Sequence, residues 1–146
     1  MEAMLGSQEA TALEERLARA GLKPTRQRVR VLEELAGEPS DSTAQELHRR
    51  LVRAGESIGL ATIYRTLGAL AERGLVDTLT HVPGVACYRL CGEQHHHHLV
   101  CLECHRVAEI TDCDLEVWLD RVASEQGFVA TAHHVEVVGV CADCRK

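Results

Sequence analysis

Two Cys-x-x-Cys pairs constrain the fold of this chain more than any other feature. Cys101-Leu-Glu-Cys104 and Cys141-Ala-Asp-Cys144 are separated by 36 residues. Two thiolates three positions apart on a turn can face one ion, and two such turns complete a closed tetrahedral zinc site. A redox role is disfavoured, because a thioredoxin-like pair lies in a βαβ setting and needs no second pair. The spacing therefore predicts a structural four-cysteine zinc site within the C-terminal half.

An unbroken run of four histidines precedes the first cysteine pair. In an extended segment the side chains alternate between two faces, so His95 and His97 would point one way and His96 and His98 the other. Two imidazoles cannot fill a four-coordinate shell alone. The run therefore predicts two separate metal sites, each completed by residues from elsewhere, with a solvated histidine tract as the alternative.

Two residues further along the chain are candidates to complete the first of these sites. Glu116 lies among apolar residues of an expected helix that Asp112 would cap and Gly127 would end. His133 lies among apolar residues of an expected long strand, residues 128–140. A buried carboxylate or imidazole needs a partner, and an ion shared with the histidines would supply one. A hydrogen-bonded core histidine or a solvated glutamate explains either residue alone.

Charge and composition indicate a folded chain with two dissimilar parts. Hydrophobic residues make up 45% of the sequence and charged residues 26%, as in ordinary globular proteins. Residues 11–75 carry a net charge of +2 and residues 76–146 a net charge of −6. No run approaches the roughly 20 apolar residues of a membrane span, and no signal peptide is recognisable, so we expect a cytoplasmic protein without disulfides.

The N-terminal half has the periodicity of short helices followed by a hairpin. We expect helices that start at the capping-box residue Thr11, at Pro24, at Thr43 and at Leu60, and stop near Gly21, Gly37, Gly55 and Gly74. The period then changes to two in residues 75–81 and 85–90, around a Pro-Gly turn. A helix-turn-helix followed by such a wing is typical of DNA-binding domains. Asp77 and Cys91 flank the wing and could join His96 and His98 at the second histidine site.

The outward face of the fourth helix is the candidate DNA-contacting surface. Thr62, Tyr64 and Arg65 lie on it with Gly68, which is unfavourable in a helix unless another backbone approaches closely. An arginine can contact a guanine edge or a phosphate, and the hydroxyls can bind phosphate oxygens. Arg28 on the second helix could add a backbone contact. A solvated polar face is the alternative.

These features together resemble the ferric uptake regulator (Fur) family of bacterial metal-sensing repressors. The resemblance runs from Gly21 to the end of the chain and rests on four segments: Gly21-Leu-Lys-Pro-Thr25, Leu60-Ala-Thr-Ile-Tyr-Arg-Thr-Leu67, the histidine run with Cys101-x2-Cys104, and residues 133–144. It implies an α+β protein with a winged-helix DNA-binding domain over residues 1–90, a hinge at about 88–95, and an α/β dimerisation domain over residues 95–146. It also implies a homodimer that binds palindromic double-stranded operator DNA with metal as corepressor.

Within the family the chain is most similar to the zinc uptake regulators, which implies up to three zinc ions per subunit. The structural site would consist of Cys101, Cys104, Cys141 and Cys144, the regulatory site of His95, His97, Glu116 and His133, and the hinge site of Asp77, Cys91, His96 and His98. The Cys91 thiolate favours zinc over iron(II) or manganese(II). Cys87, Cys113, His81, His105 and His134 match no family ligand.

We therefore expect a zinc-responsive repressor of zinc uptake and homeostasis genes, with no small-molecule substrate and no membrane partner. A sensor of iron, manganese or nickel would share the fold and differ in the ion. A zinc hydrolase is weaker, since no obvious general base or His-Glu-x-x-His motif accompanies the histidines. A metal buffer would not need the Tyr64–Arg65 face. The overall charge of −6 is unusual for a DNA-binding protein, and neutralisation by zinc is one way to offset it.

Overall fold

A computed structural model describes the backbone of residues 2–146 and the side chains from Gln8 onward. The chain divides into two compact units, Met1–Glu93 and Gln94–Lys146. Within the described residues, no helix is both long and apolar enough to cross a membrane.

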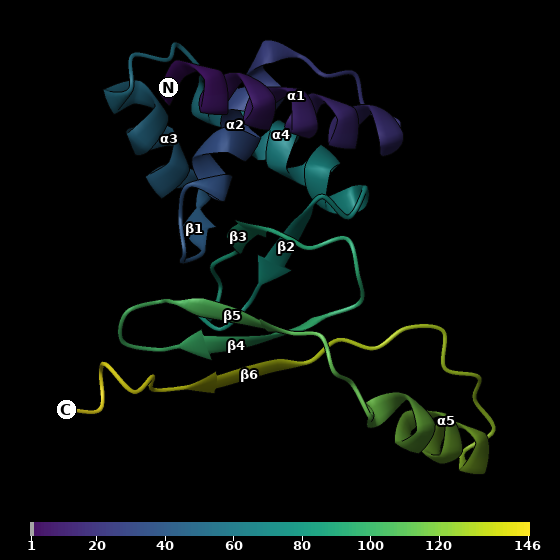
Figure 1. Ribbon diagram of the computed structural model, residues 1–146. Helices are drawn as coiled ribbons and strands as arrows, with labels where there is room; N and C mark the ends of the chain where they lie inside the picture. Colours follow the sequence, from purple (N-terminus) through teal and green to yellow (C-terminus); the bar gives the residue numbers. More distant parts are fainter. Residues whose placement is uncertain (1) are drawn as a thin grey trace. The chain divides into compact units, whose positions relative to one another are not determined.

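Four helices form most of the N-terminal unit (Figure 1): α1 (Glu2–Arg19), α2 (Arg26–Ala36), α3 (Ala44–Arg53) and α4 (Leu60–Glu72). Thr25 caps α2 by accepting a hydrogen bond from the Arg28 N–H, and Thr43 forms a complete capping box with Glu46 at α3. The expected start of the first helix at Thr11 is wrong, because α1 already begins at Glu2. A Thr-x-x-Glu pattern can also occur inside a helix when the residues before it are themselves helix formers, as Ala, Met, Leu and Gln are here.

The wing is an antiparallel sheet of three short strands in the order β1-β3-β2. The hairpin of β2 (Val76–Leu79) and β3 (Cys87–Leu90) is present as expected, although each strand is shorter than its sequence pattern. The two-residue strand β1 (Ser42–Thr43) pairs with β3 and was not expected, because two residues carry no periodicity. This third strand connects the wing to the start of α3.

The core of the N-terminal unit is built from leucines of all four helices. The fully buried side chains include Leu17, Leu32, Leu47, Leu51, Ile63, Leu67 and Leu70. Their burial removes one face of each helix from water and stabilises the bundle by roughly 1.5–3 kcal/mol per side chain. On α4 this leaves the opposite face, with Tyr64 and Arg65, exposed.

The C-terminal unit contains a second three-stranded sheet and one helix. Strands β4 (His97–Cys101), β5 (Val107–Ile110) and β6 (Glu136–Gly139) lie in the order β5-β4-β6, with β4 antiparallel to β5 and parallel to β6. Helix α5 (Leu115–Glu125) connects β5 to β6, and its N-cap is Asp114 rather than the expected Asp112.

The long strand expected over residues 128–140 is reduced to Glu136–Gly139. A strand extends only as far as its partner, and β4 offers just the four residues 98–101 to pair with β6. Residues 128–135 therefore have no regular structure. His133 lies in this irregular segment and not on a strand face.

Candidate metal centres and DNA-contacting face

The four cysteines converge at one end of the C-terminal sheet. Cys101 ends β4 and Cys104 lies in the following turn, whereas Cys141 and Cys144 lie in the turn after β6. The parallel pairing of Cys101 with Gly139 brings these two turns together. All four sulfur atoms lie within 4.8 Å of one another, and the Cys104 and Cys141 sulfurs are 3.8 Å apart. Two thiolates bound tetrahedrally at about 2.3 Å from zinc would also be separated by about 3.8 Å.

Backbone amides favour the thiolate form of one cysteine in this cluster. Hydrogen bonds from backbone amides to the Cys101 sulfur lower the pKa of Cys101 to about 6, first that of Cys104, then that of Cys141 at 3.3 Å, with a smaller one from Glu103. The pKa of Cys144 is raised to about 12, because its thiol shares hydrogen bonds with Cys141 and Cys104. The cluster therefore holds a thiolate at neutral pH, and metal binding would release the protons of the other thiols.

Three imidazoles form a second cluster at the start of the same sheet. The Nε2 atoms of His95, His97 and His133 lie at the corners of a triangle with all three edges 3.2 Å long. Nitrogens bound tetrahedrally at about 2.0–2.1 Å from zinc would be separated by about 3.3–3.4 Å. Burial, followed by the neighbouring imidazoles, lowers the pKa of His97. That ring is therefore held in the neutral form that binds metals.

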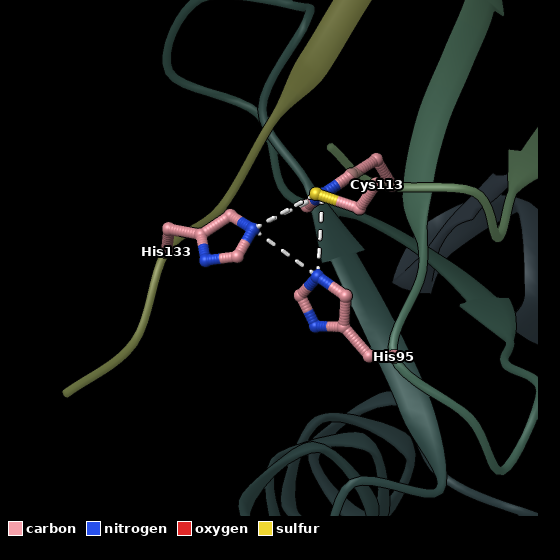
Figure 2. Close-up of side chains that lie close together, drawn as sticks. His95, Cys113 and His133 are labelled. Atoms are coloured by element: carbon pink, nitrogen blue, oxygen red, sulfur yellow. Dashed lines mark hydrogen bonds between the residues drawn. The ribbon is translucent and has the colours of Figure 1, made fainter. Parts of the chain in front are cut away.

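Cys113 is the fourth member of this cluster, and the sequence analysis missed it (Figure 2). Its sulfur lies 2.9 Å from His97 Nε2 and 3.3 Å from His133 Nε2. The register explains the position: His97 pairs with Ile110 at the end of β5, so the loop that follows Ile110 passes beside the histidines. This proximity depends on the pairing of β5 with β4. The sequence pattern does not predict β5, so it does not predict Cys113 as a neighbour of the histidines.

Glu116, expected as the fourth ligand of this site, lies outside the cluster. Its side chain is exposed on the first turn of α5. It lines a hollow together with His95 and His133, beside Asp120 and the segment Ala130–Ala132. Glu116 therefore faces the same open space as two of the imidazoles without touching them.

The residues expected at the hinge site are divided between the two units. In the N-terminal unit, the ligand atoms of Asp77 and Cys91 lie within 4.8 Å of each other, and the buried Cys91 thiol donates to the Gly74 carbonyl at 3.0 Å. In the C-terminal unit, the rings of His96 and His98 lie 5.0 Å apart between centroids, and His98 is fully buried. A single ion bound by all four residues stays a prediction.

Three of the four predicted DNA-contacting residues, Thr62, Tyr64 and Arg65, lie on α4. Tyr64 and Arg65 are exposed, and the Arg65 guanidinium donates to the Thr62 hydroxyl at 3.3 Å. Gly68 has nothing within 4 Å of the position a Cβ would occupy, so this face is open to a close approach. Arg28 on α2 instead donates to the Lys23 carbonyl at 2.8 Å. The α4 face is thus exposed to phosphates or bases, whereas the Arg28 guanidinium forms its hydrogen bond with a carbonyl of the same unit.

Known proteins resemble this chain both in sequence and in fold. The model of the ferric uptake regulator family matches residues 19–138. A zinc uptake regulation protein of Mycobacterium tuberculosis is 46% identical over 129 residues, which cover 88% of this chain and 99% of the relative. The ferric uptake regulation protein of Escherichia coli K12 is 38% identical over 134 residues, with 89% and 90% coverage. A zinc uptake regulator solved with zinc and DNA superposes with a TM-score of 0.78 at 25% identity, over 95% of this chain and 94% of that one.

We expect Cys144→Ser to abolish zinc binding at the four-cysteine cluster and to destabilise the C-terminal unit by several kcal/mol. A hydroxyl does not replace a thiolate, and structural zinc contributes about 10–16 kcal/mol of binding free energy in small zinc domains. Zinc content can be measured with a chromophoric chelator. Thermal unfolding can be followed through Trp118, the single tryptophan of the chain, which lies on α5.

The matched control is Ala142→Ser, which adds a hydroxyl in the same turn and keeps all four thiols. Its zinc content and unfolding temperature should equal those of the unchanged protein. Unchanged zinc content in Cys144→Ser would contradict a four-thiolate structural centre.

Proposed function

Because this chain belongs to the ferric uptake regulator family, we propose that it is a zinc-responsive transcriptional repressor whose zinc-loaded homodimer binds palindromic operator DNA. The observation that carries the proposal is the equilateral set of imidazole nitrogens, which matches a tetrahedral zinc shell, in a chain that also has a winged-helix unit. Its expected targets are zinc uptake and homeostasis genes, and its place of action is the cytoplasm.

The ligand chemistry favours zinc over the other metals that this family senses. Thiolates and imidazoles suit zinc, whereas carboxylate-rich oxygen shells suit manganese and similar hard cations. Cys91 supplies a thiolate to the predicted hinge site, and three imidazoles form the regulatory cluster. The 46% identity to a zinc uptake regulation protein, against 38% to a ferric uptake regulation protein, points the same way. An iron, manganese or nickel sensor is therefore not favoured.

Exposed apolar surface on the C-terminal unit supports a homodimer. In residues 94–146, all of which the structure describes, the only buried hydrophobic residues are Val100, Cys101 and Val107. Large apolar side chains of α5, of the segment after it and of β6 are exposed: Val117 at 81%, Trp118 at 51%, Phe128 at 71%, Val129 at 88% and Val138 at 48%. Exposed apolar side chains of this number and size call for a covering partner, and we propose a second copy of the chain.

We propose three zinc ions per subunit with distinct roles. The four-cysteine site would be structural, and the regulatory site would consist of His95, His97 and His133 with Glu116 from the adjoining hollow. The hinge site would bind Asp77, Cys91, His96 and His98, and so connect the wing to the start of the C-terminal unit. With zinc at the hinge, two recognition helices would be held at the spacing of two major-groove half-sites.

An enzymatic function is excluded by the family and disfavoured by the sites. A catalytic zinc keeps an open position for water beside a general base. Each of the proposed shells here has four protein ligands. The chain is a regulator and not an enzyme.

Arg65→Ala should weaken zinc-dependent operator binding by about 1–3 kcal/mol, or roughly 5- to 150-fold in Kd, because it removes a base or phosphate contact. Fluorescence anisotropy with a labelled operator, in excess zinc and then in excess chelator, measures the change. Arg121→Ala, an exposed arginine on α5, is the control and should bind like the unchanged protein. DNA binding that does not respond to chelator would refute a zinc-dependent repressor.

Cys91→Ser should leave the dimer and the structural zinc intact while zinc-dependent operator binding weakens. The variant removes the hinge thiolate, so the two DNA-binding units of the dimer stay mobile. The free energy of DNA binding must then offset the entropy that is lost when these units are ordered. Size-exclusion chromatography and zinc content establish the first part, and anisotropy establishes the second. If zinc promotes operator binding equally in both proteins, the hinge site has no part in the switch.

Glu116→Gln should lower the affinity of the regulatory zinc by at least about tenfold, whereas Cys113→Ser should change it little. A carboxylate is already ionised at neutral pH, whereas a thiol must first lose its proton. Competition with a chelator of known affinity measures both variants. The reverse ranking would assign the fourth position to Cys113.

A further inference from the structure

A fourth group of metal-binding side chains lies in the N-terminal unit, away from all the residues assigned above. It consists of Asp41, His81 and Cys87, whose ligand atoms all lie within 4.8 Å of one another. The Asp41 carboxylate and His81 Nε2 are 3.4 Å apart, and these side chains are only 3% and 0% exposed. The Cys87 thiol is also buried.

Strand pairing brings three residues that are distant in sequence into one neighbourhood. Cys87 begins the central strand β3 and pairs with Thr43 on one side and Leu79 on the other. Asp41 lies just before β1, and His81 lies two positions after the end of β2. Both residues are outside the strands, so their side chains are not bound to the alternation of the sheet. Their ligand atoms lie within 4.8 Å of the Cys87 sulfur.

The donor set has the composition of a transition-metal site. Carboxylate, imidazole and thiolate are the three common protein ligands of zinc. One carboxylate, one thiolate and one neutral imidazole carry two negative charges, which a divalent cation would balance in a buried setting where uncompensated charge is costly. The 3.4 Å between the Asp41 oxygen and the His81 nitrogen is close to the separation of about 3.3 Å for an oxygen and a nitrogen that share one tetrahedral zinc.

We propose that Asp41, His81 and Cys87 bind a divalent transition metal, of which zinc fits the donors best, with water in the fourth position. This centre is additional to the three zinc ions of the proposed function. Asp41 immediately precedes β1, which leads into α3, whereas His81 and Cys87 belong to the hairpin. The ion therefore fixes the wing to the start of α3 within one unit. A direct contact between His81 and Asp41 without an ion is the alternative.

The test uses the full-length protein equilibrated at a fixed concentration of free zinc, followed by measurement of zinc per subunit by mass spectrometry. His81→Gln and Cys87→Ser should each bind one zinc fewer than the unchanged protein. His48→Gln, the same substitution on α3 of the same unit, is the matched control and should lose none. Equal zinc content in all four proteins would overturn the proposal.

A second measurement covers the case in which the variants do not fold. Anomalous scattering at the zinc edge from crystals of the unchanged, zinc-loaded protein should show a peak bonded to Asp41, His81 and Cys87. Peaks at the C-terminal sites without one here would overturn the proposal, as would a peak that forms only at millimolar zinc. Loss of the DNA-contacting function does not affect this result, so the two proposals fail separately.

Discussion

The pairing of β4 with both of its neighbours is the interaction on which the C-terminal unit depends. Its first residue, His97, belongs to the imidazole cluster, and its last, Cys101, belongs to the four-cysteine cluster. The loop after the antiparallel neighbour β5 places Cys113 at one end of β4. The turn after the parallel neighbour β6 places Cys141 and Cys144 at the other end. A slip of one residue in the β4–β6 ladder would shift His133 and Cys141 relative to His97 and Cys101, and so disturb both clusters.

Under the proposed function, bound zinc would take the place of a large hydrophobic core in this unit. Few of its apolar residues are buried, and a domain of about 50 residues rarely buries enough surface to fold unaided. Two clusters of metal ligands at opposite ends of one five-residue strand can supply the missing free energy, and the exposed apolar face can supply more through a second subunit. The N-terminal unit, with its leucine core, has no such need.

The sequence predicted the features that depend on local chemistry. The capping box of α3, the hairpin and the convergence of the four cysteines follow from residue type and spacing alone. Features that depend on sheet register could not be predicted. Cys113 joins the histidines only because β5 pairs with β4, and Asp41 meets Cys87 only because the two-residue strand β1 exists. Glu116 lines the hollow beside His95 and His133, and its role as a ligand stays a prediction, because the direction of a side chain at a helix start depends on how the helix docks.

Charge alone cannot explain how zinc would raise the affinity for DNA. Binding one divalent ion to four thiols releases up to four protons, so the structural centre leaves its surroundings more negative, in a segment with a net charge of −6 over residues 76–146. A shell of three neutral imidazoles and one carboxylate instead gains positive charge when the ion binds. These centres are built from residues outside the α4 face that carries Tyr64 and Arg65. Under the proposed function, zinc would therefore act mainly by ordering the two DNA-binding units of the dimer before they meet the operator. Reciprocity then requires operator DNA to tighten zinc binding by the same factor.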